Sequence, residues 1–313
     1  LEKYFKDYIG ALAKNYSWSK EKTLEAIKFW YGGYSWDGKT SIYNPTSILK
    51  LFSENTFSNY WLAGARSNFL PDIFKKENYC EFNFGEISVS DNFFSWPSGS
   101  ISRLFQMGYL TVCAIKRRRG EHFSTSYILG WPNEEVKLSF ARKILESLPK
   151  GKGKLIPLLE KLKDQIVKSF DTLNAKDMQK YLPSIYACIP QNKLKAKRGP
   201  YLIDNRLEVT ESNYAAFFVF ALKFLDFDVF GESRNFRESK NIVIKQAKQT
   251  IIAEVKYDEK SATLSRKVDS VLKQMKKQKY WENHICPDKK IVLLGLAFGD
   301  SGKTAKCKFE EVK

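Results

Sequence analysis

Apolar residues recur at helical spacing through most of the first half of the chain. Ser19 precedes an apolar stripe over residues 24–30 that stops at Gly32, so we predict a helix capped by the Ser19 hydroxyl. Asn44 and Pro45 predict the start of another helix, because Pro is favoured at the first helical position. This half of the chain is therefore predicted to be mainly helical.

One segment of the first half changes from helical spacing to strands. Residues 110–115 and 122–129 read as two strands, and the basic residues 116–120 between them predict the tip of a hairpin. The Arg residues of this tip could contact phosphates, although a solvated loop explains them as well. A long helix is expected to follow Glu135.

A linker divides the chain into two predicted domains. Residues 149–154 alternate Lys with Gly after a Pro, a composition typical of linkers. After it we predict a helix, three strands, a helix and a fourth strand, at residues 211–225, 227–232, 241–245, 250–255, 261–281 and 290–298. This order predicts an α/β domain with a central mixed sheet flanked by helices, in a chain that is α+β overall. We therefore place a helical accessory domain with a β-hairpin at residues 1–148 and the α/β domain at residues 149–313.

The third predicted strand of the α/β domain carries the candidate chemistry. It is nearly all apolar, which predicts a central strand, yet it ends in Glu254-Val255-Lys256. A carboxylate at the end of a buried strand is unfavourable unless it is paired or holds a metal ion, and residues two apart lie on the same face. A carboxylate beside an ammonium group suits metal-assisted cleavage of a phosphodiester. A structural Glu–Lys pair on a sheet explains the same residues.

Charge and composition narrow the classes of partner. The chain has 52 Lys and Arg against 35 Asp and Glu, a formal charge of +17, which favours a polyanionic partner because phosphate binding releases counterions. Solvated basic faces account for the charge equally well. Five Cys without a C-x-x-C pair, and two His, argue against a zinc site and a disulfide framework. No apolar run approaches the ~20 residues that span a bilayer, so no membrane partner is expected.

Short motifs follow one another along nearly the whole chain. In the first half they are residues 30–38 (WYGGYSWDG), 43–45 (YNP), 58–61 (SNYW), 105–110 (FQMGYL), 127–135 and Phe140. In the second half they are residues 211–214 (ESNY), 241–244 (NIVI), 251–256 (IIAEVK), Gln274 with Tyr280, and 289–295 (KKIVLLG). In this order they resemble bacterial proteins that join an AAA-ATPase-like region to a C-terminal PD-(D/E)XK nuclease domain.

The resemblance implies a restriction-endonuclease-like fold and roles for four residues. Glu254 would ligate Mg²⁺ or Mn²⁺, Lys256 would be the catalytic lysine, and Glu211 would be the helix carboxylate that assists the metal site. The family places Asp where this chain has Asn241, thirteen residues before Glu254 (254 − 241 = 13), as a bridging metal ligand. Asn offers only a neutral oxygen, so Mg²⁺ binding should weaken roughly 10–100-fold. Glu238 is an alternative carboxylate, but it lies on the opposite face of a regular strand.

Four residues of the predicted helix 261–281 are candidates for substrate binding. Gln274 and Tyr280 match the family's helix motif beside the active site. Lys273 and Lys277 lie on either side of Gln274 and would follow a nucleic-acid backbone, with a merely solvated helix face as the alternative. The expected partner is DNA, recognised through its backbone.

Two hypotheses for function follow. The first is a Mg²⁺-dependent DNA nuclease that Asn241 weakens or silences. The second is a catalytically degenerate pseudo-nuclease that serves as a protein- or nucleic-acid-binding module of a larger toxin, effector or defence protein. The expected location is the bacterial cytoplasm, or a host cell if the protein is an effector.

Nucleotide binding is not expected from this chain. It begins at Leu1, already within an amphipathic pattern, so we expect a fragment whose ATP-binding part would precede Leu1. Residues 297–304 fit a permissive Walker A pattern, which requires a following helix to face the phosphates. Only nine residues follow Thr304, and Lys alternates with apolar residues among them.

Overall fold

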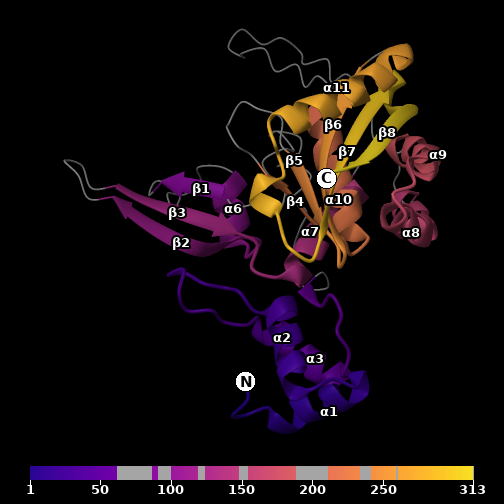
Figure 1. The fold of residues 1–313 in the computed structure, drawn as a ribbon. Coiled ribbons are helices and arrows are strands. Elements are labelled where there is room, and N and C mark those ends of the chain that lie inside the picture. The colour runs from indigo at the N-terminus through magenta and orange to yellow at the C-terminus, as the bar shows by residue number, and fades with distance from the viewer. Residues whose placement is uncertain are drawn as a thin grey trace. The chain divides into compact units, whose positions relative to one another are not determined.

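The computed structural model describes residues 1–61, 87–90, 100–118, 124–147, 154–187, 211–232, 241–258 and 260–312. These residues are a mixture of helices and strands with two separate sheets (Figure 1). They divide into two compact units, one up to Ala141 and the other from Arg142 onward. The sequence places the boundary slightly later, after residue 148.

The first unit contains the predicted helices and the hairpin. Its elements are α1 (Lys6–Tyr16), α2 (Lys20–Tyr31), α3 (Pro45–Glu54), β1 (Ile87–Ser90), α6 (Ser100–Gln106), β2 (Thr111–Arg118), β3 (Ser124–Gly130) and α7 (Glu134–Ser147), whose last residues belong to the second unit. The predicted Ser19 cap and the predicted helix start at Asn44 and Pro45 are both confirmed. Ser19 Oγ accepts a hydrogen bond from the Lys22 amide at 3.2 Å, and Asn44 Oδ1 accepts one from the Thr46 amide at 3.0 Å. The three N-terminal helices enclose a core in which Tyr31 is fully buried.

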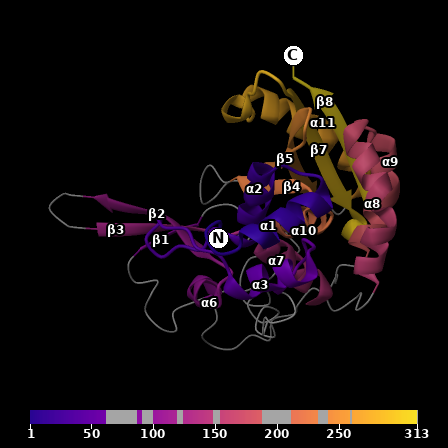
Figure 2. The same cartoon turned by 90° about the horizontal axis from the view of Figure 1, so that it is seen from below.

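The β2–β3 hairpin forms a three-stranded antiparallel sheet in the order β1-β3-β2 (Figure 2). A bulge in β2 between Val112 and Ala114 interrupts the register. β1 ends opposite Ser126, whereas β2 and β3 remain paired up to Arg118, so the last part of the hairpin is a two-stranded ribbon. The predicted hairpin is confirmed, but its predicted tip at residues 116–120 begins too early, because residues 116–118 continue β2 and pair with β3; residues 119–123 lie outside the described residues.

The second unit is built on one five-stranded sheet. Its elements are α8 (Leu155–Asp171), α9 (Ala175–Tyr186), α10 (Glu211–Phe224), β4 (Asp228–Glu232), β5 (Asn241–Lys245), β6 (Gln249–Tyr257), α11 (Leu264–Lys277), β7 (Lys290–Gly299) and β8 (Thr304–Glu311). Single 3₁₀ turns occur at Ser261–Thr263, Glu282–His284 and Asp300–Gly302. The strand order is β4-β5-β6-β7-β8, and only the β6–β7 pair is parallel, so the sheet is mixed as the sequence predicts.

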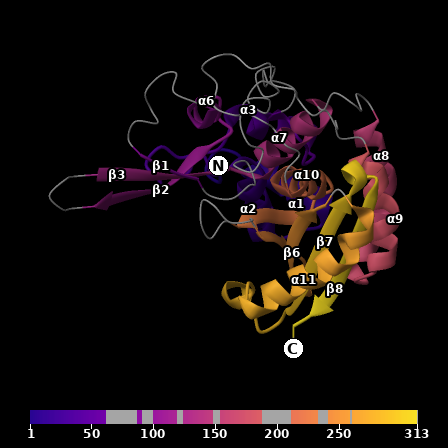
Figure 3. The same ribbon diagram turned by 90° about the horizontal axis from the view of Figure 1, so that it is seen from above.

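Helices cover both faces of this sheet. On one face Val243, Ile252 and Leu293 pack beneath Val268 and Leu272 of α11. On the other face α9 packs on β8, and α10 packs on β4 and β6. Figure 3 shows α11 and the α8–α9 pair on opposite sides of β7 and β8. Because β6 has neighbours on both edges and helices on both faces, its residues from Gln249 to Val255 are buried, and only its last two residues are partly exposed.

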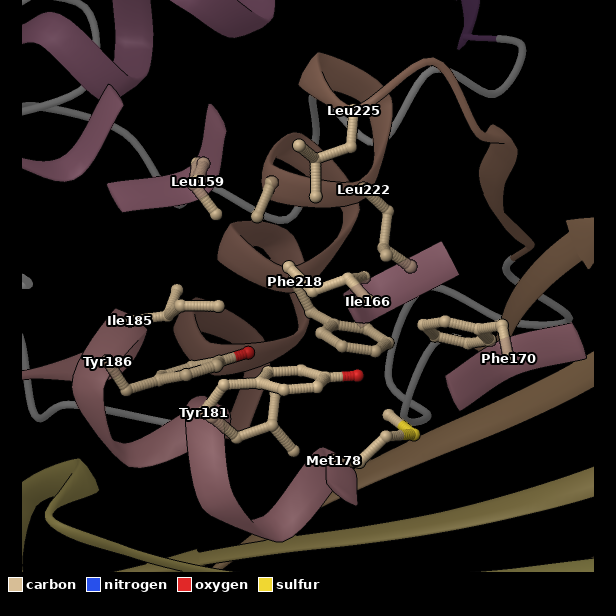
Figure 4. Close-up of a pocket in the computed structure, with 12 residues that line it drawn as sticks. Leu159, Ile166, Phe170, Met178, Tyr181, Ile185, Tyr186, Phe218, Leu222 and Leu225 are labelled. Atoms are coloured by element: carbon tan, nitrogen blue, oxygen red, sulfur yellow. The ribbon is translucent and has the colours of Figure 1, made fainter. Parts of the chain in front are cut away.

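The helices α8, α9 and α10 enclose a small apolar cavity (Figure 4). Its lining includes Leu159, Ile166, Leu182, Phe218 and Leu222. The cavity measures about 10 Å³, close to the least volume that holds one water molecule. A substrate or cofactor needs a pocket more than ten times larger, so this cavity is a packing defect of the core.

The strand β8 is absent from the sequence prediction. It pairs with β7 along its whole length, and α9 contacts it: the Gln179 side-chain amide donates to the Cys307 carbonyl oxygen at 3.0 Å. The alternation of Lys with apolar residues after Thr304 is the signal that indicates a strand here. A strand after Gly302, in place of a helix, gives the Walker-like segment none of the geometry of a phosphate-binding loop.

The packing of β8 against α9 predicts a large difference in thiol reactivity. At pH 8, Cys307 should react with iodoacetamide about 1000-fold more slowly than the exposed Cys113 and Cys286. Burial raises the pKa of Cys307 from 9.0 to about 12, so its thiolate fraction at pH 8 is about 10⁻⁴ instead of about 10⁻¹. Labelling followed by peptide mass spectrometry gives the three rates. Equal rates would show that β8 is not packed in this way.

Candidate active site

A buried ion pair lies at the end of β6. The Glu254 side chain is completely buried, and Lys256 Nζ lies 2.9 Å from Glu254 Oε1. The Lys256 side chain is 20% exposed, so its ammonium group has access to solvent. Removing a carboxylate from water is costly unless an opposite charge compensates it, and Lys256 supplies that charge. The predicted pair of residues on one face of the strand is therefore present.

The neighbouring strand β7 brings α11 close to this pair. Glu254 is in register with Gly295 of β7. A Cβ atom at Gly295 would lie 3.1 Å from the Val268 carbonyl oxygen and 3.2 Å from Leu272 Cγ, so any larger residue would push α11 outward. Gly295 thus fixes the distance between α11 and the sheet beside Glu254.

Asn241 lies opposite Glu254 on the other neighbouring strand. Ile242 pairs with Ala253, so the antiparallel register continues with Asn241 opposite Glu254, and residues opposite one another share a face. The Asn241 side chain is 3% exposed, and its Oδ1 accepts no hydrogen bond from the described residues. A buried acceptor of this kind is uncommon in folded proteins. The register therefore brings three of the predicted site residues into one cluster.

The oxygen atoms of this cluster are of the type that binds a hard divalent cation. Mg²⁺ prefers carboxylate and carbonyl oxygens, which Glu254 and Asn241 supply. Among the described residues, however, no group of three or more His, Cys, Asp or Glu could hold a metal ion. The side chain of Glu211 and the whole of Glu238 lie outside the described residues. In the backbone register Asn241 also pairs with Glu232 of β4. The sequence analysis missed this neighbour, because the proximity of the two residues depends on how the strands pair.

The first turn of α10 lies beside the end of β6. Tyr214 stacks on Tyr257 with ring centroids 5.1 Å apart and an interplanar angle of 15°. Tyr186 donates a hydrogen bond through its hydroxyl to the Tyr214 carbonyl oxygen at 2.9 Å. These contacts hold the start of α10, the helix that begins at Glu211, against the end of β6 through Tyr214.

Gln274 and Tyr280 contact each other directly. The Gln274 side-chain amide donates a hydrogen bond to the Tyr280 hydroxyl at 3.0 Å. Tyr280 is only 6% exposed and packs in the core between α11 and the sheet. Tyr280 thus restrains Gln274, which is half-buried on α11. Their role in substrate binding stays a prediction.

The lysines of α11 differ in their ion pairs. Lys276 pairs with Glu310, and Lys279, just after the helix, pairs with Glu282. Lys273 and Lys277 are exposed and form no ion pair with any residue that the structure describes. Four residues apart on a helix, these two side chains lie on the same side. Both side chains are therefore available to an anionic ligand on that side of α11.

A second buried carboxylate organises the first unit. Glu135, at the start of α7, has no exposed surface, and it accepts hydrogen bonds from the Ser47 hydroxyl at 2.8 and 3.1 Å and from the amides of Tyr60 and Trp61, both at 2.7 Å. Burial raises the pKa of Glu135, and these hydrogen bonds oppose the shift. Three segments that are separate in the sequence therefore meet at the Glu135 side chain, whose role the sequence analysis missed.

Comparisons with known proteins give a relative without an assigned activity. The chain is similar to the "uncharacterized protein in vnfD 5′ region" of Azotobacter chroococcum mcd 1, with 25% identity over 287 residues. The similarity covers 90% of this chain and 51% of that protein, so the chain spans about half the length of the relative. No family model matches the chain, and no solved structure matches it. Across the described residues, every helix is too short or too polar to cross a membrane.

Proposed function

We propose that the second unit is a metal-dependent nuclease domain of the PD-(D/E)XK type, which hydrolyses phosphodiester bonds of DNA and is weakened by Asn at position 241. The observation that carries the proposal is the cluster of Glu254, Lys256 and Asn241 at one end of the central strands. The αβββαβ order from α10 to β7 agrees with this domain type. The buried acceptor atom of Asn241 supports a ligand at this point.

Each residue has a distinct part in the proposed chemistry. Glu254 and Asn241 would hold a Mg²⁺ ion through oxygen atoms, and Glu211 would add a carboxylate from α10. The bound ion would supply Lewis-acid polarisation of the phosphate. The Lys256 ammonium group, held by Glu254, would orient water and stabilise the negative charge that develops on the phosphate oxygens. Asn241 lacks the charge of Asp, which lowers the affinity for the ion.

The DNA would lie along the outer side of α11. Lys273 and Lys277 would bind its phosphates, and each neutralised phosphate adds to affinity through released counterions. Gln274 lies between these lysines in the sequence, and Tyr280 fixes its amide by a hydrogen bond. The arrangement favours contacts to the backbone, which position DNA without reading its sequence.

A pseudo-nuclease that binds without cutting is the second candidate. The carboxylate of Glu254 is already in an ion pair, and the residue opposite it is neutral. A larger toxin, effector or defence protein could use such a domain to bind DNA or another protein. The pseudo-nuclease would bind DNA through the same residues of α11 as the nuclease, but it would not hydrolyse the phosphodiester bond.

Cleavage of supercoiled plasmid with Mg²⁺ or Mn²⁺ tests the proposal. We expect slow nicking by the unchanged chain and a loss of at least about 10²-fold in Lys256→Ala and Glu254→Gln, because each removes a group that acts on the reacting phosphate or its metal. Lys290→Ala is the matched control, since this exposed lysine lies at the other end of the same sheet.

The alternative outcomes separate the two candidates. If Lys290→Ala lowers nicking as much as Lys256→Ala does, the cleavage does not arise at this site and the proposal fails. If no version cuts DNA but Lys273→Gln/Lys277→Gln weakens DNA binding, the unit is a binding module.

A further inference from the structure

The free end of the β2–β3 ribbon combines cations with hydroxyl groups. Across the paired strands, Lys116 faces Ser126, Arg117 faces Thr125, and Arg118 faces Ser124. This run begins where β1 ends, at Ser90 opposite Ser126. Beyond that point each strand has only its hairpin partner among the described residues, so the cationic end of the hairpin is the part that no third strand covers.

The described part of the ribbon carries only positive charge. Residues 111–118 and 124–130 include Lys116, Arg117 and Arg118 and contain no Asp or Glu. The side chains of Lys116 and Arg117 are exposed, and within the described residues neither has a carboxylate partner. Other exposed lysines do have such a partner: Lys308 Nζ, for example, lies 2.9 Å from Asp269 Oδ1. Among the described residues, the charges of Lys116 and Arg117 are therefore uncompensated.

Strand geometry distributes these donors over both faces of the ribbon. Successive side chains of a strand alternate between faces, so Lys116 and Arg117 point to opposite sides. Residues opposite each other across the pair share a face, which places a Ser126 hydroxyl beside Lys116 and a Thr125 hydroxyl beside Arg117. Ammonium, guanidinium and hydroxyl groups are the side-chain donors that proteins use for phosphate oxygens.

We propose that this end of the β2–β3 ribbon, Lys116 and Arg117 with Thr125 and Ser126, binds the sugar-phosphate backbone of double-stranded DNA. A two-stranded ribbon fits a major groove, and cations on both faces then meet the two phosphate strands that border it. A lipid surface fits less well, because membrane binding needs exposed apolar side chains, and none of the exposed large apolar residues of the described chain lies on β2 or β3.

The test measures binding of a fluorescein-labelled 30-base-pair duplex by anisotropy over a range of salt concentrations, in EDTA so that no cleavage occurs. Lys116→Gln/Arg117→Gln should lower affinity roughly tenfold and reduce the slope of log K against log salt by about 1.8, because two phosphate contacts are lost at about 0.9 each. Lys6→Gln/Lys14→Gln is the matched control: it removes the same net charge from exposed positions of α1 in the same unit. This control should change the slope by less than about 0.5.

Thermal melting of both variants shows whether either substitution disturbs folding. Lys116→Arg/Arg117→Lys keeps both charges and should have the same slope of log K against log salt as the unchanged protein. Equal losses in the ribbon and control variants would overturn the proposal, because they would reflect net charge alone. An unchanged salt slope in Lys116→Gln/Arg117→Gln would also overturn the proposal. So would a result in which this variant binds DNA normally but no longer binds phosphatidylserine vesicles, because the ribbon would then bind lipid. Because no step requires catalysis, the result is independent of the plasmid-nicking test of the second unit.

Discussion

Asn241→Asp increases Mg²⁺-dependent cleavage of DNA by roughly 10–100-fold, if the cluster on β5 and β6 is a nuclease centre weakened at one ligand. The new carboxylate lies opposite Glu254 and contributes the charge that a hard cation requires. Without metal, two carboxylates on one buried face repel each other, so the variant should melt at a lower temperature in EDTA. Mg²⁺ should then raise the melting temperature of the variant more than that of the unchanged protein.

Three companion variants make this expectation specific. Asn283→Asp adds the same charge at an exposed position of the second unit, and it should change neither cleavage nor the response of the melting temperature to Mg²⁺. Asn241→Asp/Lys256→Ala should lose cleavage but keep the Mg²⁺-dependent melting shift, because Lys256 acts on the phosphate. Asn241→Asp/Glu254→Gln should lose both. Absence of both cleavage and a melting shift in Asn241→Asp would contradict the metal site.

Glu135→Ala destabilises the first unit by about 3 kcal/mol or more. The substitution leaves the Ser47 hydroxyl and the amides of Tyr60 and Trp61 buried without their acceptor, and each such loss costs about 1–3 kcal/mol. The corresponding fall in melting temperature is about 6–12 °C. Differential scanning calorimetry of the whole chain measures it. A change below about 2 °C would show that the carboxylate does not organise these segments.

Two variants separate the hydrogen bonds of Glu135 from its charge. Glu135→Gln keeps an acceptor oxygen and should cost less than Glu135→Ala, whereas Glu146→Ala, in the same helix but exposed, should cost about 0.5 kcal/mol or less. The pKa of Glu135 is raised above its ordinary 4.5, so its stabilising contribution is complete below that value and falls as the pH rises through the folded pKa. Gln does not titrate. The stability that Glu135→Gln loses relative to the unchanged protein should therefore be smaller at pH 8 than at pH 4.5.

The sequence predicts the elements of the second unit well where one local signal dominates. The prediction for β5, residues 241–245, has the observed bounds, and β6 differs only by extending one residue earlier and two later. The predicted helix 261–281 begins later, at Leu264, because Asp258 accepts hydrogen bonds from the Lys260 amide and the Thr263 hydroxyl and stabilises a 3₁₀ turn before α11. It also ends earlier, at Lys277. Local propensity fixes the type of an element better than its ends.

Contacts between distant segments are the part that the sequence does not predict. In the sequence, Glu135 is an acidic residue in the first turn of a helix, and the helix dipole alone explains an acidic residue at that position. Its partners lie 74 to 88 residues earlier, and no local pattern reports them. The proximity of Asn241 to Glu254 likewise depends on the register of two strands, which the turn between them sets.

The ion pair at the end of β6 also bears on how such a domain changes during evolution. The charge of Glu254 is balanced by Lys256 of its own strand, so the fold does not depend on a bound cation to hold mutually repelling ligands together. In the proposed nuclease, replacing an Asp by Asn at position 241 would then remove catalytic capacity at little cost to folding. A lineage that loses cleavage in this way keeps an intact scaffold, and selection on binding alone is enough to maintain it.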